Sequence, residues 1–85
     1  MRQPRDGQGP SANDILQRLY DSEINAGIEW VWDGGVKWQL GDELNGWRAT
    51  GSAATVALAV PELAESAAAE YPESDFAEWW RRRGS

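Results

Sequence analysis

An alternation of large apolar side chains on both sides of a tight turn constrains the fold of this chain more than any other feature. Large apolar residues occupy every second position of Ile28–Trp32 and of Val36–Leu40, and Asp33-Gly34-Gly35 separates the two runs. Alternation with period two is typical of half-buried strands, and a short glycine-containing connection predicts a β-hairpin. A three-residue loop with Gly35 in the left-handed region puts every large residue on one face, with Trp32 opposite Val36, Trp30 opposite Trp38 and Ile28 opposite Leu40.

A third strand is predicted at Trp47–Thr50, after a polar turn over residues 41–46. Pairing Leu40 with Trp47 and Trp38 with Ala49 continues the apolar face. The opposite face then carries two cross-strand rows of mainly polar residues, which are Glu29, Gln39 and Arg48 in one row and Val31, Lys37 and Thr50 in the next. Such a face is suited to contact with water or with a partner.

Helices are predicted before and after the three strands in the chain. Ser11 and Asp14 resemble a capping box, and apolar residues then follow at helical spacing until Asn25-Ala26-Gly27 offers a left-handed stop. Proline suits the first turn of a helix, so a second helix is predicted over Pro61–Glu70. Residues 52–59 remain open among an extra helical turn, an extension of the third strand and an irregular crossing.

The order of elements predicts an α+β fold. It is a two-layer sandwich of helix, three-stranded antiparallel sheet and helix (αβββα), followed by a short C-terminal helix that begins at Ser74-Asp75 and carries Phe76. Residues 1–10 hold two prolines and two glycines and are predicted to be a disordered arm. Residues 11–80 form the single domain, and residues 81–85 form a basic tail.

Charge is distributed unevenly along the chain. Between Asp14 and Glu78 there are thirteen carboxylates and only three basic side chains, a formal charge of −10. Histidine and cysteine are absent, and Lys37 is the single lysine, so the usual nucleophiles and bases are missing. The composition therefore favours a binding protein over an enzyme, with no cofactor and no metal. Unlike potentials steer encounters, so the partner is expected to be basic, with no direct binding of nucleic acid.

Two other functions that the residues suggest are disfavoured. The turn from Asp42 to Gly46 contains acids, but the positions that would begin and end a calcium-binding loop hold Gly41 and Ser52. The order of elements looks like that of double-stranded RNA-binding domains. Those domains grip phosphates with lysines at the start of the second helix, where this chain has none.

No run of residues approaches the roughly 20 apolar positions that span a bilayer. The first ten residues also lack the apolar segment of a signal peptide. The sequence therefore predicts a cytoplasmic monomer that does not contact membranes.

Three segments carry a resemblance to known proteins. The block from Ile24 to Gly35, the segment Leu40–Gly46 and the later Tyr71-Pro72-x-Ser74-x-Phe76-Ala77 look like a group of small proteins from GC-rich proteobacteria and their phages. Among short, acidic, cysteine-poor phage proteins, a recurrent role is that of the anti-CRISPR proteins, which block type I surveillance complexes. The resemblance implies a non-enzymatic inhibitor that is similar to DNA in charge. It would occupy the basic groove where target DNA or its PAM would sit.

The predicted partner-binding residues are acids outside the packed faces, together with two adjacent tryptophans. They are Glu29, Asp33, Asp42, Glu43, Glu62, Glu65, Glu70, Glu73, Asp75, Glu78, Trp79 and Trp80. Neighbouring residues on a helix point about 100° apart, so one of the two tryptophans is expected to stay partly exposed. The alternative function is a small structural or regulatory domain that binds its partner through these tryptophans and the open sheet face.

Overall fold

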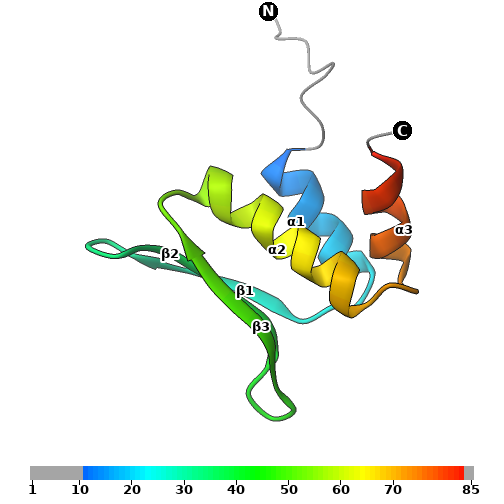
Figure 1. Ribbon diagram of the computed structural model, residues 1–85, viewed down its shortest axis with the longest axis horizontal. Coiled ribbons are helices and arrows are strands. Elements are labelled where there is room, and N and C mark those ends of the chain that lie inside the picture. Colours follow the sequence, from blue (N-terminus) through cyan, green and yellow to red (C-terminus); the bar gives the residue numbers. More distant parts are fainter. Residues whose placement is uncertain (1–10, 84–85) are drawn as a thin grey trace, which may run out of the picture.

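The computed structural model describes residues 11–83, which form one three-stranded antiparallel sheet with three helices on one face (Figure 1). The elements are α1 (Ala12–Asp21), β1 (Ala26–Val31), β2 (Gly35–Asp42), β3 (Gly46–Ala53), α2 (Val56–Glu70) and α3 (Asp75–Arg82). This order confirms the predicted α+β fold with a short C-terminal helix. The predicted arm of residues 1–10 lies outside the described residues, and Arg81 and Arg82 continue α3.

Helix α1 begins at its predicted cap but ends before its predicted stop. The backbone N–H of Asp14 donates to the Ser11 hydroxyl at 3.1 Å, and the Ser11 N–H donates to the Asp14 carboxylate at 3.3 Å. The helix ends at Asp21, before the predicted stop, and Glu23 takes the left-handed conformation with φ of 61°. Ala26 and Gly27 belong to β1, because Asn25 already accepts a hydrogen bond from β2 through its carbonyl oxygen.

Residues 52–59 are divided between a strand and a helix. Strand β3 continues to Ala53, and α2 begins at Val56 because the Thr55 hydroxyl accepts the Leu58 N–H at 3.2 Å. Pro61 therefore lies inside the helix, beyond its first turn. It leaves the carbonyl of exposed Ala57 without its helical donor, a cost that water at the surface can offset.

The β1–β2 hairpin turns one residue earlier than predicted. The Gly34 N–H donates to the Val31 carbonyl at 2.9 Å and closes the turn there, so Trp32, Asp33 and Gly34 form the loop. Gly35 has the expected positive φ, 88°, but lies in β2, where an added Cβ would be 2.7 Å from the Ala53 carbonyl oxygen. The actual pairs are Val31 with Gly35, Trp30 with Val36, Ile28 with Trp38 and Ala26 with Leu40. The shift is even, so the predicted faces of β1 and β2 are kept.

A bulge between β2 and β3 overturns two predicted side-chain positions. Leu40 pairs with Ala49 and Gly41 pairs with Trp47, so Arg48 is an extra residue. An extra residue reverses the alternation of faces beyond it. Trp47 therefore joins the open face, and Arg48 turns to the helical side, where its guanidinium lies 5.1 Å from the centre of the Tyr71 ring.

The core lies between the sheet and α2, which packs on β2 and β3 and is flanked by α1 and α3. Its largest fully buried side chains are Phe76, Leu40, Leu63 and Val60. Only two of the six tryptophans, Trp38 and Trp80, are buried. The prediction that all of the sheet tryptophans face the helices is wrong. The bulge puts Trp47 on the open face, and Trp30 and Trp32 belong to the β1–β2 hairpin, which reaches past the helical layer (Figure 1).

Trp38 joins the two layers. Its indole N–H donates to the Glu62 carboxylate of α2 at 3.0 Å, and its ring lies directly over Gly51 of β3. A Cβ on Gly51 would be 2.5 Å from the ring, so the indole fits only because this position has no side chain.

We expect Gly51→Ala to lower the free energy of unfolding by about 1–3 kcal/mol, the usual cost of overpacking a core. Gly27→Ala is the matched control, because a Cβ there meets its nearest side-chain atom at 3.9 Å, an ordinary contact. Urea unfolding followed by tryptophan fluorescence measures both variants. Equal losses in the two variants would contradict the role given to Gly51.

Candidate partner-binding surfaces

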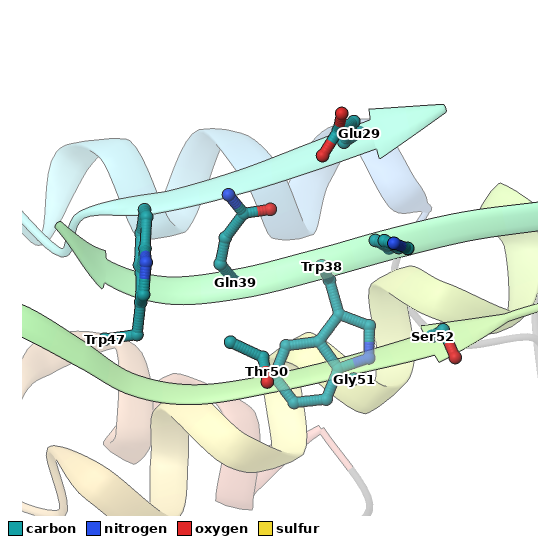
Figure 2. A pocket seen from close by; sticks show the side chains of 8 residues that line it. Glu29, Trp38, Gln39, Trp47, Thr50, Gly51 and Ser52 are labelled. Atoms are coloured by element: carbon teal, nitrogen blue, oxygen red, sulfur yellow. The ribbon is translucent and has the colours of Figure 1, made fainter. Parts of the chain in front are cut away.

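The open face of the sheet forms a shallow groove of about 440 Å³ (Figure 2). Its lining residues come from all three strands and are mostly polar, namely Glu29, Lys37, Gln39, Trp47, Thr50 and Ser52, with Trp38 and Gly51 at its floor. Trp47 stands up beside Gln39 from the neighbouring strand (Figure 2). The prediction of a mainly polar face holds for Glu29, Gln39, Lys37 and Thr50, while the bulge replaces Arg48 by an aromatic ring.

Five of the predicted acids are already used inside the fold. Glu62 accepts the Trp38 indole N–H, Glu70 lies 3.7 Å from Arg48, and Glu78 lies 3.8 Å from Arg82. Asp42 accepts hydrogen bonds from the Asn25 side chain and from the backbone and side chain of Asn45. Glu65 accepts the indole N–H of Trp80 and forms an ion pair with Arg83. These carboxylates orient other residues, which limits what they can offer to a partner.

The other five predicted acids are fully available. Glu29, Asp33, Glu43, Glu73 and Asp75 are all exposed. Within residues 11–83, none of these carboxylates has an ion pair or a hydrogen bond to another side chain. They lie on three separate parts of the fold, which are the hairpin β1–β2, the turn after β2 and the start of α3.

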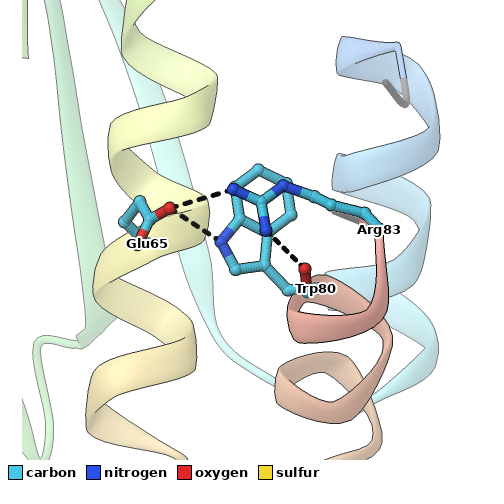
Figure 3. Close-up of polar contacts among 3 residues, drawn as sticks. All are labelled: Glu65, Trp80 and Arg83. Carbon is cyan, nitrogen blue, oxygen red and sulfur yellow. Dashed lines mark hydrogen bonds and ion pairs between the residues drawn. The ribbon is translucent and has the colours of Figure 1, made fainter. Parts of the chain in front are cut away.

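The C-terminal tryptophans are part of the packing. Trp80 is buried, donates its indole N–H to Glu65 at 3.1 Å, and is covered by the Arg83 guanidinium 3.6 Å from the ring centre (Figure 3). Arg83 also reaches Glu65 at 3.1 Å, which closes a three-residue cluster. Trp79 is half-buried and has Arg18 of α1 at 4.9 Å from its ring centre.

The exposed tryptophans are on the sheet and its first turn, where the sequence predicts burial against the helices. Trp30 is 79% exposed, Trp32 is 88% exposed and Trp47 is 45% exposed. The alternation that predicts a strand does not say how far helices cover it. A usable signal was the position of Trp30 and Trp32 next to the β1–β2 turn, at the opposite end of β1 from its connection to α1.

No metal-binding cluster is found in the described part of the chain, since His, Cys, Asp and Glu form no suitable group of three there. In the same residues, no helix has the length and apolar character needed to cross a bilayer. Comparisons with protein-family models, with curated proteins and with solved structures found no match. The assignment of function therefore depends on the surfaces described above.

Asp42 offers a titration that tests the β2–β3 turn. The Asn45 backbone N–H, at 2.8 Å, is the main cause that lowers the pKa of Asp42 below 3.8, and the side chains of Asn45 and Asn25 lower it further. Because the folded pKa is depressed, this carboxylate stabilises the turn above pH 3.8. That contribution is lost as the pH falls through the folded pKa.

We expect Asn45→Ala to raise the pKa of Asp42 only part of the way to 3.8, because the backbone donor of residue 45 is kept. Carboxyl chemical shifts from an NMR titration measure the change. Asn25→Ala should raise the pKa less, because its hydrogen bond is a smaller cause of the shift. A pKa of Asp42 unchanged by both substitutions would contradict the proposed origin of the shift.

Proposed function

We propose that this chain is a non-enzymatic binding protein that occupies a basic surface of a nucleic-acid-handling complex. The supporting observation is an asymmetry in how its charges are used. Every arginine in residues 11–83 contacts an aromatic ring, a carboxylate or a backbone carbonyl of its own chain, whereas five predicted acids are free. The surface offered to a partner is therefore negative, and it attracts basic partners.

The finer proposal is an inhibitor of the anti-CRISPR kind, acting on a type I surveillance complex. It is supported by the charge and by the resemblance of the segments around Ile24–Gly35. A protein that competes with DNA must match the negative potential of phosphates. The five free carboxylates supply negative charge, while the three consecutive arginines Arg81, Arg82 and Arg83 contact Pro72, Glu78 and Glu65 of their own chain.

We expect the chain to displace fluorescent target DNA from a purified type I surveillance complex at about 0.15 M salt. Displacement should weaken by roughly tenfold or more in high salt, because exposed charges are screened. Asp33→Lys with Glu43→Lys should weaken it further, and the neutral pair Asp33→Asn with Glu43→Gln should fall between that variant and the wild type. Such a graded series is the signature of charge.

A gel-shift assay with single- and double-stranded DNA provides the control. The chain alone should leave both probes unshifted. A clear shift of either probe, or no displacement of DNA from the complex, would contradict the proposal.

A second candidate function rests on the exposed tryptophans. Trp30, Trp32 and Trp47 are all exposed, and exposed tryptophans are typical anchors of protein interfaces. In this case the chain is a small interaction domain with a largely apolar contact. Its binding would respond little to salt and would be lost on Trp30→Ala or Trp32→Ala.

A further inference from the structure

Strand β1 has one free edge, since the sheet order is β1-β2-β3. The Gly41 N–H donates to the Asn25 carbonyl at 2.8 Å, which identifies Asn25 and Gly41 as a hydrogen-bonded pair. Such pairs alternate along an antiparallel ladder, so Gly27, Glu29 and Val31 direct their backbone groups to β2. The backbone groups of Ala26, Ile28 and Trp30 therefore point outward.

An apolar groove runs beside this edge. It encloses about 380 Å³ and is lined by α1, by β1 and by one residue of α2, chiefly through Leu16, Tyr20, Ile24, Ile28 and Leu63. The side chain of Ile28 lies on the helical side of β1, and exposed Trp30 follows two residues later on the same side. A strand added to the edge would place every second side chain over this groove.

The charges along the edge are negative. Asp21 and Glu23 precede β1, Glu29 lies within it and Asp33 lies at the hairpin tip, and all four are exposed. Of the nearest basic groups, Arg18 stacks on Trp79, and exposed Lys37 lies directly opposite Glu29 on β2 without forming an ion pair with it. A second copy of the chain would bring the same acids together, so the charge favours a basic partner.

The two edges of the sheet differ in protection. Exposed edges are usually guarded by lysine, proline, a bulge or a covering element. Strand β3 has a bulge at Arg48, whereas β1 has neither a bulge nor a lysine or proline among its six residues. Free backbone groups, an apolar groove and a negative border thus occur together only at β1 in the described part of the chain.

We infer that the β1 edge binds an extended segment of a protein partner as a fourth strand. The segment has apolar side chains at every second position, over the groove, and lysine or arginine between them, near Glu29. This mode of binding is strand addition, in which backbone hydrogen bonds give affinity and alternate side chains give specificity. The basic partner rests on the proposed function, and the inference adds how that partner is held.

The first test compares two peptides of the same composition, both with acetylated N-termini and amidated C-termini. One alternates valine and lysine over about seven residues, the length of a common strand. The other has its lysines and valines in two separate blocks. The alternating peptide should bind about tenfold more tightly in a fluorescence titration, since only it can present its valines together on one face.

Hydrogen exchange locates the bound peptide. The amides of Ala26, Ile28 and Trp30 should exchange more slowly with the alternating peptide present, while those of Gly27, Glu29 and Val31 should be unchanged. N-methylation of alternate peptide amides should abolish the slowed exchange, because it removes the peptide's donors to β1. This control needs no variant of the protein. Protection along β3 in place of β1 would overturn the inference.

A protein variant provides the second test. Ile28→Lys blocks the groove side of the edge, and Thr50→Lys makes the same charge change on the open face of β3. Only Ile28→Lys should reduce binding of the alternating peptide by about tenfold or more.

The outcomes separate the inference from the proposed function. Equal binding of both peptides, or of neither, overturns strand addition and leaves the DNA-displacement assay to decide the function. Selective binding at β1 without displacement of DNA would support the edge site and contradict the nucleic-acid-handling partner.

Discussion

The contact of Trp38 with Gly51 and Glu62 holds the two layers of this protein together. The indole lies over the bare backbone of β3 and donates its N–H at 3.0 Å to a carboxylate on α2. A buried tryptophan contributes a large apolar area, and its one polar atom needs a partner to avoid a desolvation cost. Glu62 satisfies that atom. The angle of α2 on the sheet, and hence the place of α1 and α3 beside it, depends on this fit.

The same layer arrangement explains which surfaces are offered to a partner. The helices cover only part of the sheet, so the hairpin extends beyond them and its tryptophans remain exposed (Figure 1). The arginines that follow Trp80 contact groups of their own chain, as Arg83 contacts Trp80 and Glu65 (Figure 3). The result is a surface on which acids and aromatic rings are available and most positive groups are not. Such a surface suits a basic partner with extended apolar segments.

Sequence reasoning succeeded where local chemistry is sufficient. The Ser11 cap, the strand alternation and the positive φ of Gly35 were all predictable, because each depends on a few neighbouring residues. It failed for Trp47 and Arg48, whose faces were reversed by the bulge at Arg48, opposite Leu40 and Gly41. It also assigned Glu62, Glu65 and Glu70 to the partner surface, although each has an internal contact that involves a residue more than ten positions away.

The sequence by itself determined the order of the elements, the polarity of each face of the hairpin and the negative charge of the body. Those properties follow from periodicity and composition, which do not change with packing. Only the tertiary structure decided which tryptophans are buried, which acids are free and which sheet edge is open. These depend on how far α1 and α2 extend over the sheet and on a single extra residue in β3. Long-range packing sets both, and no local pattern encodes it.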